Sequence, residues 1–185
     1  MAVIEIVDKI STAIDNSEYS AGVFIDLSKA FDTLDHHIIY DKLEHYEIRG
    51  TDLNWFISYL TNRLQYVGYN NTQLKRLSTK CGVPQGSILG PILFLMYINY
   101  IINISNLLHL ILFADDTNIF IHQKNLEKLI EILNEELDKL TNWFVSNRLS
   151  LNFKKTNFII FYSPQKIYKR DDVNIILNGN KVEQI

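Results

Sequence analysis

The segment Leu108-His-Leu-Ile-Leu-Phe-Ala-Asp-Asp-Thr-Asn-Ile-Phe-Ile-His122 decides how the rest of the sequence is interpreted. Two apolar runs flank the dipeptide Asp115-Asp116, and their lengths and composition predict two buried strands joined by a tight turn. Adjacent carboxylates at such a tip repel each other, and charge is costly to hold beside apolar strands. A divalent cation bound by both would remove this cost. Because an isolated Asp-Asp pair is more often plain turn chemistry, the metal-site interpretation depends on the flanking strands.

A third acid, Asp26, ends the short apolar run that begins at Gly22, and this run predicts a buried strand. Mg²⁺ typically binds one or two protein carboxylates together with substrate phosphates. Two such ions can hold the attacking and leaving oxygens of a phosphoryl transfer. Asp26, Asp115 and Asp116 are therefore candidate ligands for Mg²⁺, with Mn²⁺ as a possible substitute.

The remaining chain alternates between helical and strand patterns, without repeats or linkers, and predicts a single α+β domain over residues 1–185. We expect an antiparallel sheet with helices packed on one face. The predicted helices cover residues 2–15, the second part of 28–46, 53–60, 87–102 and 126–144. The predicted strands, beyond those above, are 64–69 paired with 74–81, 158–162 and 173–177.

The composition narrows the classes of protein that this chain can represent. The chain of 185 residues is 47% hydrophobic, which fits a folded globular domain. No apolar run reaches the roughly 18 residues of a membrane helix, so we expect no membrane partner. The single cysteine, Cys81, excludes an internal disulfide and suggests a reducing, intracellular location, whether nuclear or cytoplasmic. The net charge of −3 argues mildly against nucleic-acid binding, but an acidic centre with basic flanks would give a similar sum.

Four motifs in this sequence resemble, in order and approximate spacing, those of the reverse transcriptases of non-LTR, jockey-like retrotransposons. The similarity covers essentially the whole chain. The segments that resemble motifs A, B, C and D are, in that order, Phe24-Ile-Asp26-Leu-Ser-Lys-Ala-Phe31-Asp32-Thr, Gly82-Val-Pro-Gln85-Gly86-Ser-Ile-Leu-Gly90-Pro91, Phe113-Ala-Asp-Asp116 and Leu149-Ser-Leu-Asn152-Phe-Lys-Lys155-Thr156.

The resemblance implies a polymerase palm, with part of the fingers, that adds dNMP to the 3′-hydroxyl of a DNA primer on an RNA template. It implies that Asp26, the Leu27 carbonyl, Asp115 and Asp116 hold the metal ions. It further implies that Lys155 is the general acid for the leaving pyrophosphate, and without the motif this lysine would be read as a solvated charge.

The motifs also imply which residues contact the nucleotide. Phe31 matches the bulky residue that rejects a ribose 2′-hydroxyl, and without the motif it would be read as a core aromatic. Gln85 and Gly86 match the segment beside the incoming nucleotide and the template base, and alone they would be an ordinary turn. Asp32 matches a frequent acid of the family and is expected to be structural or to support the site residues from outside the site, with Lys29 as a candidate partner.

The region 64–81 carries candidate nucleic-acid contacts, through ring stacking and phosphate binding, at Tyr66, Lys75, Arg76 and Lys80. A solvated hairpin face is an equally good interpretation of these residues.

The chain also departs from the family pattern. Residues 1–23 contain one basic residue, Lys9, where complete enzymes have a basic fingers region, and the sequence stops at a segment that resembles the lead-in to the primer grip. We therefore expect a domain truncated at both ends, with weak or no polymerase activity by itself. The main alternative is an inactive remnant that at most binds RNA. An RNA-templated RNA polymerase is a weaker alternative, because Phe31 and Phe113-Ala-Asp-Asp116 argue against it.

Overall fold

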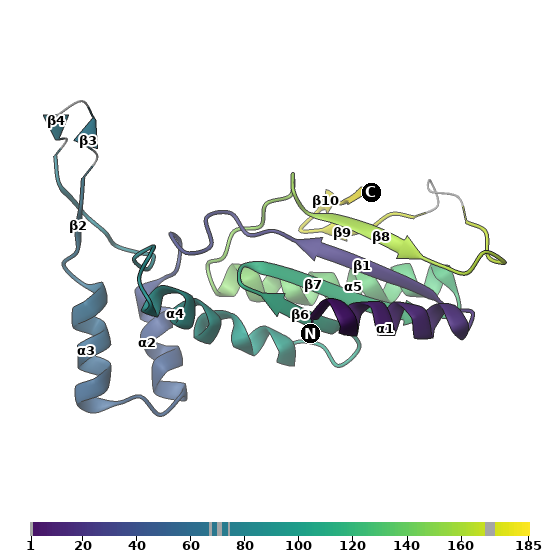
Figure 1. Ribbon diagram of the computed structural model, residues 1–185, viewed down its shortest axis with the longest axis horizontal. Helices are drawn as coiled ribbons and strands as arrows, with labels where there is room; N and C mark the ends of the chain where they lie inside the picture. The colour runs from purple at the N-terminus through teal and green to yellow at the C-terminus, as the bar shows by residue number, and fades with distance from the viewer. Residues whose placement is uncertain (1, 67, 70–71, 74, 169–172) are drawn as a thin grey trace. The chain divides into compact units, whose positions relative to one another are not determined.

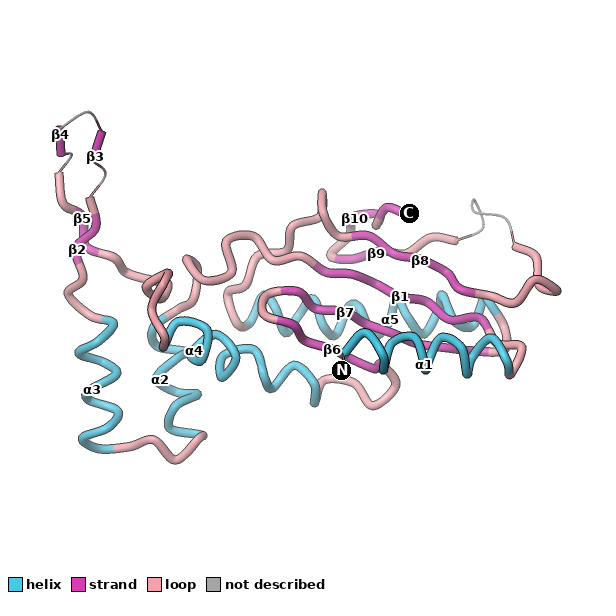
Figure 2. The backbone as a smooth tube through the Cα atoms, viewed as in Figure 1, coloured by secondary structure: helices cyan, strands magenta, loops and turns pink. Residues whose placement is uncertain are grey.

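The computed structural model describes residues 2–66, 68–69, 72–73, 75–168 and 173–185 (Figures 1 and 2). The chain divides into two compact units. The first, Met1–Ser28 with Ile101–Ile185, is called the sheet unit here, and the second, Lys29–Tyr100, is called the helical unit. The expectation of one domain stays a prediction, and each unit is described by itself.

The sheet unit is built on a five-stranded sheet in the order β11-β8-β1-β7-β6. The pairs β1·β7, β1·β8 and β6·β7 are antiparallel, and β11 runs parallel to β8. The α+β class and the mostly antiparallel sheet are therefore as predicted. The strands are β1 (Tyr19–Ile25), β6 (His109–Phe113), β7 (Asp116–Gln123), β8 (Asn157–Phe161) and β11 (Glu183–Gln184), beside the small pair β9 (Ile176–Leu177) and β10 (Asn180–Lys181).

Two helices accompany this sheet. The long helix α5 (Leu126–Ser146) lies behind the sheet in Figure 1, and α1 (Ala2–Asp15) lies in front of it. The apolar positions of α5 repeat every three or four residues, so they form one stripe that can be buried against the strands. Leu133, Leu137 and Phe144 of this stripe are fully buried. Val23 on β1 and Ile119 on β7 are also fully buried. This core holds the central strands at a fixed register.

The helical unit contains α2 (His36–His45), α3 (Gly50–Leu60) and α4 (Leu89–Ile98), and α2 packs against both of the others. Asp35 caps α2, because its carboxylate accepts from the backbone N–H groups of His37 (2.9 Å) and Ile38 (3.2 Å). Between α3 and α4 the chain forms a narrow hairpin. Its strands are β2 (Leu64–Gln65), β3 (Gly68–Tyr69), β4 (Thr72–Gln73) and β5 (Leu77–Ser78), with β2 paired to β5 and β3 to β4.

Two sequence predictions for this region need correction. The helix expected over residues 87–102 ends at Ile98 and continues as the 3₁₀-helix η1 (Asn99–Asn103). Ser87 precedes the N-cap, Ile88, although its hydroxyl still accepts from the N–H of Gly90 at 3.0 Å. The expected turn at residues 70–71 and the start of the second hairpin strand at residue 74 lie outside the described residues. Among the helices of the described residues, none is long and apolar enough to cross a membrane.

Lys42 on α2 is half-buried in the helical unit. Its ammonium group donates to the backbone carbonyl of Tyr97 and lies 4.7 Å from the centre of the Tyr97 ring. Desolvation lowers the pKa of Lys42 from 10.5 to about 8. Between these two values the unfolded chain binds a proton that the folded chain does not, so stability rises with pH across this window.

We therefore expect the free energy of unfolding of the wild type to rise relative to that of Lys42→Met as the pH increases from about 8 to 10.5. Urea denaturation of both proteins at several pH values measures this difference, and groups that titrate in both proteins cancel from it. Parallel stability curves for the two proteins would contradict the assignment.

Candidate functional site

The sheet unit gathers the three predicted metal ligands at one edge. β1 runs antiparallel to β7 with Ile25 opposite Thr117, and continuing this register by one residue places Asp26 opposite Asp116. Directly opposed residues of an antiparallel pair lie on the same face of the sheet, with Cβ atoms about 5 Å apart. Figure 1 shows the end of β1 beside the turn between β6 and β7. The register therefore places the acid at the end of β1 beside the hairpin that carries the other two.

The turn between β6 and β7 is as tight as the sequence predicts. Phe113 pairs with Asp116, so only Ala114 and Asp115 form the loop. Ala114 has a φ of 52°, the left-handed conformation that the first loop residue adopts in the primed turns of two-residue hairpins. Asp115 is half-buried and Asp116 is exposed. Neither carboxylate has a hydrogen bond or an ion pair with any residue that the structure describes, so both are available to an external ligand.

Asp26 is held from the other side by the loop that resembles motif D. The Asn152 side-chain amide donates to one Asp26 carboxylate oxygen at 2.7 Å, and the Asn152 backbone N–H donates to the Asp26 carbonyl at 2.9 Å. The backbone N–H of Asp26 lies 3.4 Å from the hydroxyl of Thr156, which is buried. Asn152 therefore orients the Asp26 carboxylate. Sequence analysis did not identify this role, because the two residues lie 126 positions apart and only their motif membership hinted at proximity.

Asn152→Ala is expected to lower the free energy of unfolding by about 1–3 kcal/mol, because the variant loses a hydrogen bond to a charged acceptor. Asn180→Ala is the matched control and is expected to cost less, since Asn180 is exposed and its amide donates to a neutral acceptor, the Asn178 carbonyl, at 3.0 Å. Chemical denaturation measures both changes. If removing Asn152 costs no stability, the amide does not hold Asp26.

The two other predicted site residues of the sheet unit are Lys155 and Leu27. Lys155 is exposed, and its backbone N–H donates to the Asn152 carbonyl at 3.1 Å, so it belongs to the loop that holds Asp26. Leu27 is buried and forms a bridge with Leu151. The general-acid role of Lys155 and the ligand role of the Leu27 carbonyl stay predictions.

In the helical unit, the segment that contains Phe31 and Asp32 contacts the segment that contains Gln85 and Gly86. The N–H of Val83 donates to the Phe31 carbonyl at 2.8 Å, which ties the chain after motif A to motif B. The Phe31 ring packs on Phe94, with centroids 4.9 Å apart. The Gln85 amide donates to the Asp32 carboxylate at 2.8 Å. The expected partner of Asp32 is therefore wrong: Gln85, not Lys29, contacts its carboxylate.

Gly86 has a φ of 77°, and a Cβ atom at this position would meet no other atom within 4 Å. The residue therefore combines a left-handed backbone with open space beside it, as expected where a ligand approaches the main chain. Its nucleotide contact stays a prediction.

The four predicted nucleic-acid contacts, Tyr66, Lys75, Arg76 and Lys80, are all exposed in the helical unit. The guanidinium of Arg76 lies 5.7 Å from the centre of the Tyr66 ring, across the hairpin. The structure thus brings two of the four residues together.

The three acids have the chemistry of a hard-cation site. They offer only carboxylate oxygens, which suit Mg²⁺. Within the described ranges, however, no three His, Cys, Asp or Glu side chains already form a group that could hold a metal ion. Asp26 and Asp116 are neighbours through the strand register, and Asp115 follows in the turn. The residues present therefore fit a cation in chemical type, and the strand register places two of the three acids opposite each other.

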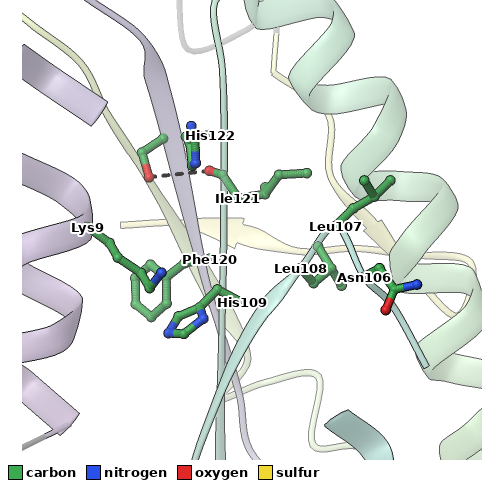
Figure 3. A pocket seen from close by; sticks show the side chains of 9 residues that line it. Lys9, Asn106, Leu107, Leu108, His109, Phe120, Ile121 and His122 are labelled. Carbon is green, nitrogen blue, oxygen red and sulfur yellow. Dashed lines mark hydrogen bonds between the residues drawn. The ribbon is translucent and has the colours of Figure 1, made fainter. Parts of the chain in front are cut away.

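A pocket of about 240 Å³ lies elsewhere in the sheet unit, between α1, the sheet and the loop before β6 (Figure 3). Lys9 on α1, His109 on β6 and His122 on β7 line it, together with Phe120. His109 is 2.8 Å from Glu5 of α1, and His122 is 2.6 Å from Glu18. None of the predicted site residues lines this pocket.

Comparison with known proteins points in one direction. A family model described as reverse transcriptase (RNA-dependent DNA polymerase) matches residues 3–181. The chain is 25% identical over 160 residues to a probable RNA-directed DNA polymerase from transposon X-element of Drosophila melanogaster. It is 26% identical over 158 residues to the RNA-directed DNA polymerase from mobile element jockey of the same organism. These matches cover 84% and 80% of this chain but only 18% and 17% of the two relatives.

Solved structures share the fold. The chain resembles telomerase from Candida albicans, with a TM-score of 0.57 and 15% identity over 97% of this chain and 32% of that one. It also resembles apo telomerase from Candida tropicalis, with a TM-score of 0.59 and 14% identity over 97% of this chain and 38% of that one. At these identities the likeness concerns the fold alone.

Proposed function

The chain belongs to the reverse transcriptase (RNA-dependent DNA polymerase) family, and on this premise we propose that it is the polymerase palm of a non-LTR retrotransposon, extending a DNA primer on an RNA template. The observation that carries the proposal is the register of β1 with β7, which gathers Asp26, Asp115 and Asp116 at one sheet edge. The relatives from mobile elements support the assignment to a retrotransposon. The chain spans less than a fifth of the length of both relatives, so the activity of a whole enzyme is part of the proposal.

Members of this family generally use divalent metal ions. We propose Mg²⁺ as the ion, held by Asp26 with Asp115 and Asp116, because Mg²⁺ prefers oxygen ligands and few carboxylates. When bound, such ions neutralise charge on the attacking and leaving oxygens of the transferred phosphoryl group. The protein's own part is to hold three carboxylates at one edge, with Asp26 oriented by Asn152.

In the proposed reaction, the primer 3′-hydroxyl loses its proton to solvent and its oxygen attacks the α-phosphorus of a dNTP. A new P–O bond forms, the bond from the α-phosphorus to the oxygen that bridges to the β-phosphate breaks, and pyrophosphate leaves. Such a transfer depends mostly on positioning and on stabilisation of charge. Lys155 carries a proton that the leaving pyrophosphate would take up. Its place on the loop that holds Asp26 supports this role, since the same loop also carries Asn152.

The helical unit would supply nucleotide selection. Phe31 presents an aromatic ring backed by Phe94, which limits how far the ring can move. A ring in contact with C2′ of the sugar leaves no room for a 2′-hydroxyl, so deoxynucleotides would be preferred. Gln85, held by Asp32, and Gly86, with its open backbone, would lie against the incoming nucleotide.

Primer extension on an RNA template with Mg²⁺ tests the proposal, comparing the wild type with Asp115→Ala. We expect weak dNMP incorporation by the wild type, because the chain spans less than a fifth of its relatives, and the loss of this incorporation in the variant, with dNTPs used in preference to rNTPs. Circular dichroism establishes that both proteins are folded. Equal incorporation by the two proteins, or none by a folded wild type, would overturn the proposal and favour an inactive remnant.

A further inference from the structure

An aromatic and arginine stack covers one side of α3 and continues past its end. Trp55 and Tyr59 stack face to face, with ring centroids 5.6 Å apart and planes inclined by 9°. Arg63 lies three residues beyond the end of α3, and its guanidinium is 4.7 Å from the centre of the Tyr59 ring. These three residues, spaced four positions apart, are called the α3 stack. Residues at this spacing share one side of a helix, so the stack forms a continuous row.

The α3 stack is ordered and open to solvent. Arg63 is fixed by a second contact, because its Nε donates to the Tyr59 carbonyl at 2.8 Å. Arg63 is exposed, and 54% of Trp55 is accessible to solvent. Trp55 also contacts the Phe56 ring edge to face, with centroids 5.1 Å apart, so its ring is held from two sides while about half of the residue remains accessible.

The hairpin that follows α3 repeats the same combination. Tyr66 is 47% exposed and lies opposite Arg76, whose guanidinium is 5.7 Å from the centre of the ring. Figure 2 shows this hairpin leaving the end of α3 as a narrow arm. Helix and hairpin together therefore offer a series of aromatic faces with arginines beside them.

The charge of this region indicates the chemistry of its partner. From Leu53 to Lys80 the sequence contains four basic residues and no acidic one, although the whole chain has a net charge of −3. Positive charge attracts a phosphate backbone, and aromatic faces bind unpaired bases by stacking. Aromatic and arginine side chains also occur in protein interfaces, but four basic residues without an acidic one favour a phosphate-bearing partner.

We propose that the α3 stack and the Tyr66–Arg76 pair form a binding surface for a single-stranded nucleic acid, the unpaired template strand. This inference rests on the proposed polymerase function, which supplies a reason for a template to be present. Bases stack on Trp55 and Tyr66, and the phosphates lie near Arg63, Arg76 and the neighbouring lysines. The surface holds the template strand without reading its sequence, because every base has a face that can stack.

A fluorescence titration tests this surface. The variant Trp143→Phe leaves Trp55 as the only tryptophan, so its emission reports on the α3 stack alone. We expect a single-stranded oligouridylate to quench this emission. An abasic strand of equal length is expected to bind more weakly and to quench little, because it carries phosphates without bases. An RNA duplex is also expected to quench little, since its bases are already stacked.

Affinity measurements by fluorescence anisotropy complete the test. Trp55→Ala and Tyr66→Ala are each expected to weaken binding of the single strand about tenfold. Arg63→Gln and Arg76→Gln are each expected to weaken it and to reduce the slope of log affinity against log salt by about 0.7. Ile167→Ala, at an apolar residue 88% exposed in the sheet unit, is the control and is expected to bind like the wild type.

Three results would each overturn the proposed binding surface. They are wild-type affinity in all four variants, absence of quenching by the single strand, and equal quenching by the abasic strand. Failure of the surface is distinguishable from failure of the proposed function. If Asp115→Ala abolishes primer extension while the four surface variants bind normally, the polymerase assignment stands and the template surface does not.

Discussion

Replacing Asp26 with asparagine is expected to reduce RNA-templated dNMP incorporation by about a thousandfold, because the site loses several kcal/mol of stabilisation of the developing charge. Asp26 follows the last residue of β1, lies opposite Asp116 in the strand register and is oriented by Asn152. It is therefore the central member of the acidic edge, the end of the sheet that carries Asp26, Asp115 and Asp116. Asparagine has nearly the same size, and its oxygen can still accept from Asn152. The fold is therefore expected to remain.

Asp138→Asn is the matched control, since Asp138 is an exposed acid on α5 and belongs to none of the four motifs. Single-turnover primer extension compares the three proteins, and thermal denaturation establishes that all are folded. Near-normal incorporation by Asp26→Asn would show that this carboxylate is dispensable and that the acidic edge is not the reacting centre.

The second large effect concerns Gly82, at the start of motif B. Its φ is 81°, and a Cβ atom there would lie 2.7 Å from the backbone oxygen of Asp32. The backbone of Gly82 is also tied in place: its N–H donates to the Leu34 carbonyl at 2.7 Å and its carbonyl accepts from His36 at 2.8 Å. Gly82→Ala therefore combines a strained φ with a clash that side-chain movement cannot relieve, and it is expected to cost about 3 kcal/mol or more.

Gly86→Ala separates these two causes. Gly86 has a similar φ of 77°, but a Cβ atom there meets nothing within 4 Å. Only the strained backbone remains, so the expected cost is about 1 kcal/mol. Urea denaturation of both variants measures the difference. Equal costs for the two alanines would mean that the close approach of Gly82 to Asp32 does not exist in solution.

The sequence predicted the strands and the turn that carry Asp26, Asp115 and Asp116, because local patterns encode them, and the metal-binding role of these acids stays a prediction. Apolar runs end at Asp26 and at Asp115, and strands of this kind end at the edge of a buried sheet, where charge can reach solvent. The sequence predicted a tight turn between the two runs but placed both acids in it, whereas Asp116 already belongs to β7. α5 was equally predictable, because its apolar stripe has the helical period.

Contacts between residues that are distant in the sequence were harder to predict from it. The Asn152 contact with Asp26 joins positions 126 apart, and the Gln85 contact with Asp32 joins positions 53 apart. Both contacts depend on the packed fold, and Lys29, a basic residue only three positions from Asp32, looked like its natural partner. The α3 stack was missed because Trp55 and Tyr59 at helical spacing look like core residues, and only the structure shows that Trp55 is exposed.

The central claim is that Asp26, Asp115 and Asp116 together bind divalent cations at the sheet edge. A calorimetric titration of Mn²⁺, in the presence of dNTP, into the wild type and into the triple variant Asp26→Asn, Asp115→Asn, Asp116→Asn tests this claim directly. We expect the wild type to bind Mn²⁺, the folded triple variant to show none of this binding, and Mg²⁺ to compete for the same sites. No uptake by the wild type, or equal uptake by the triple variant, would contradict the account.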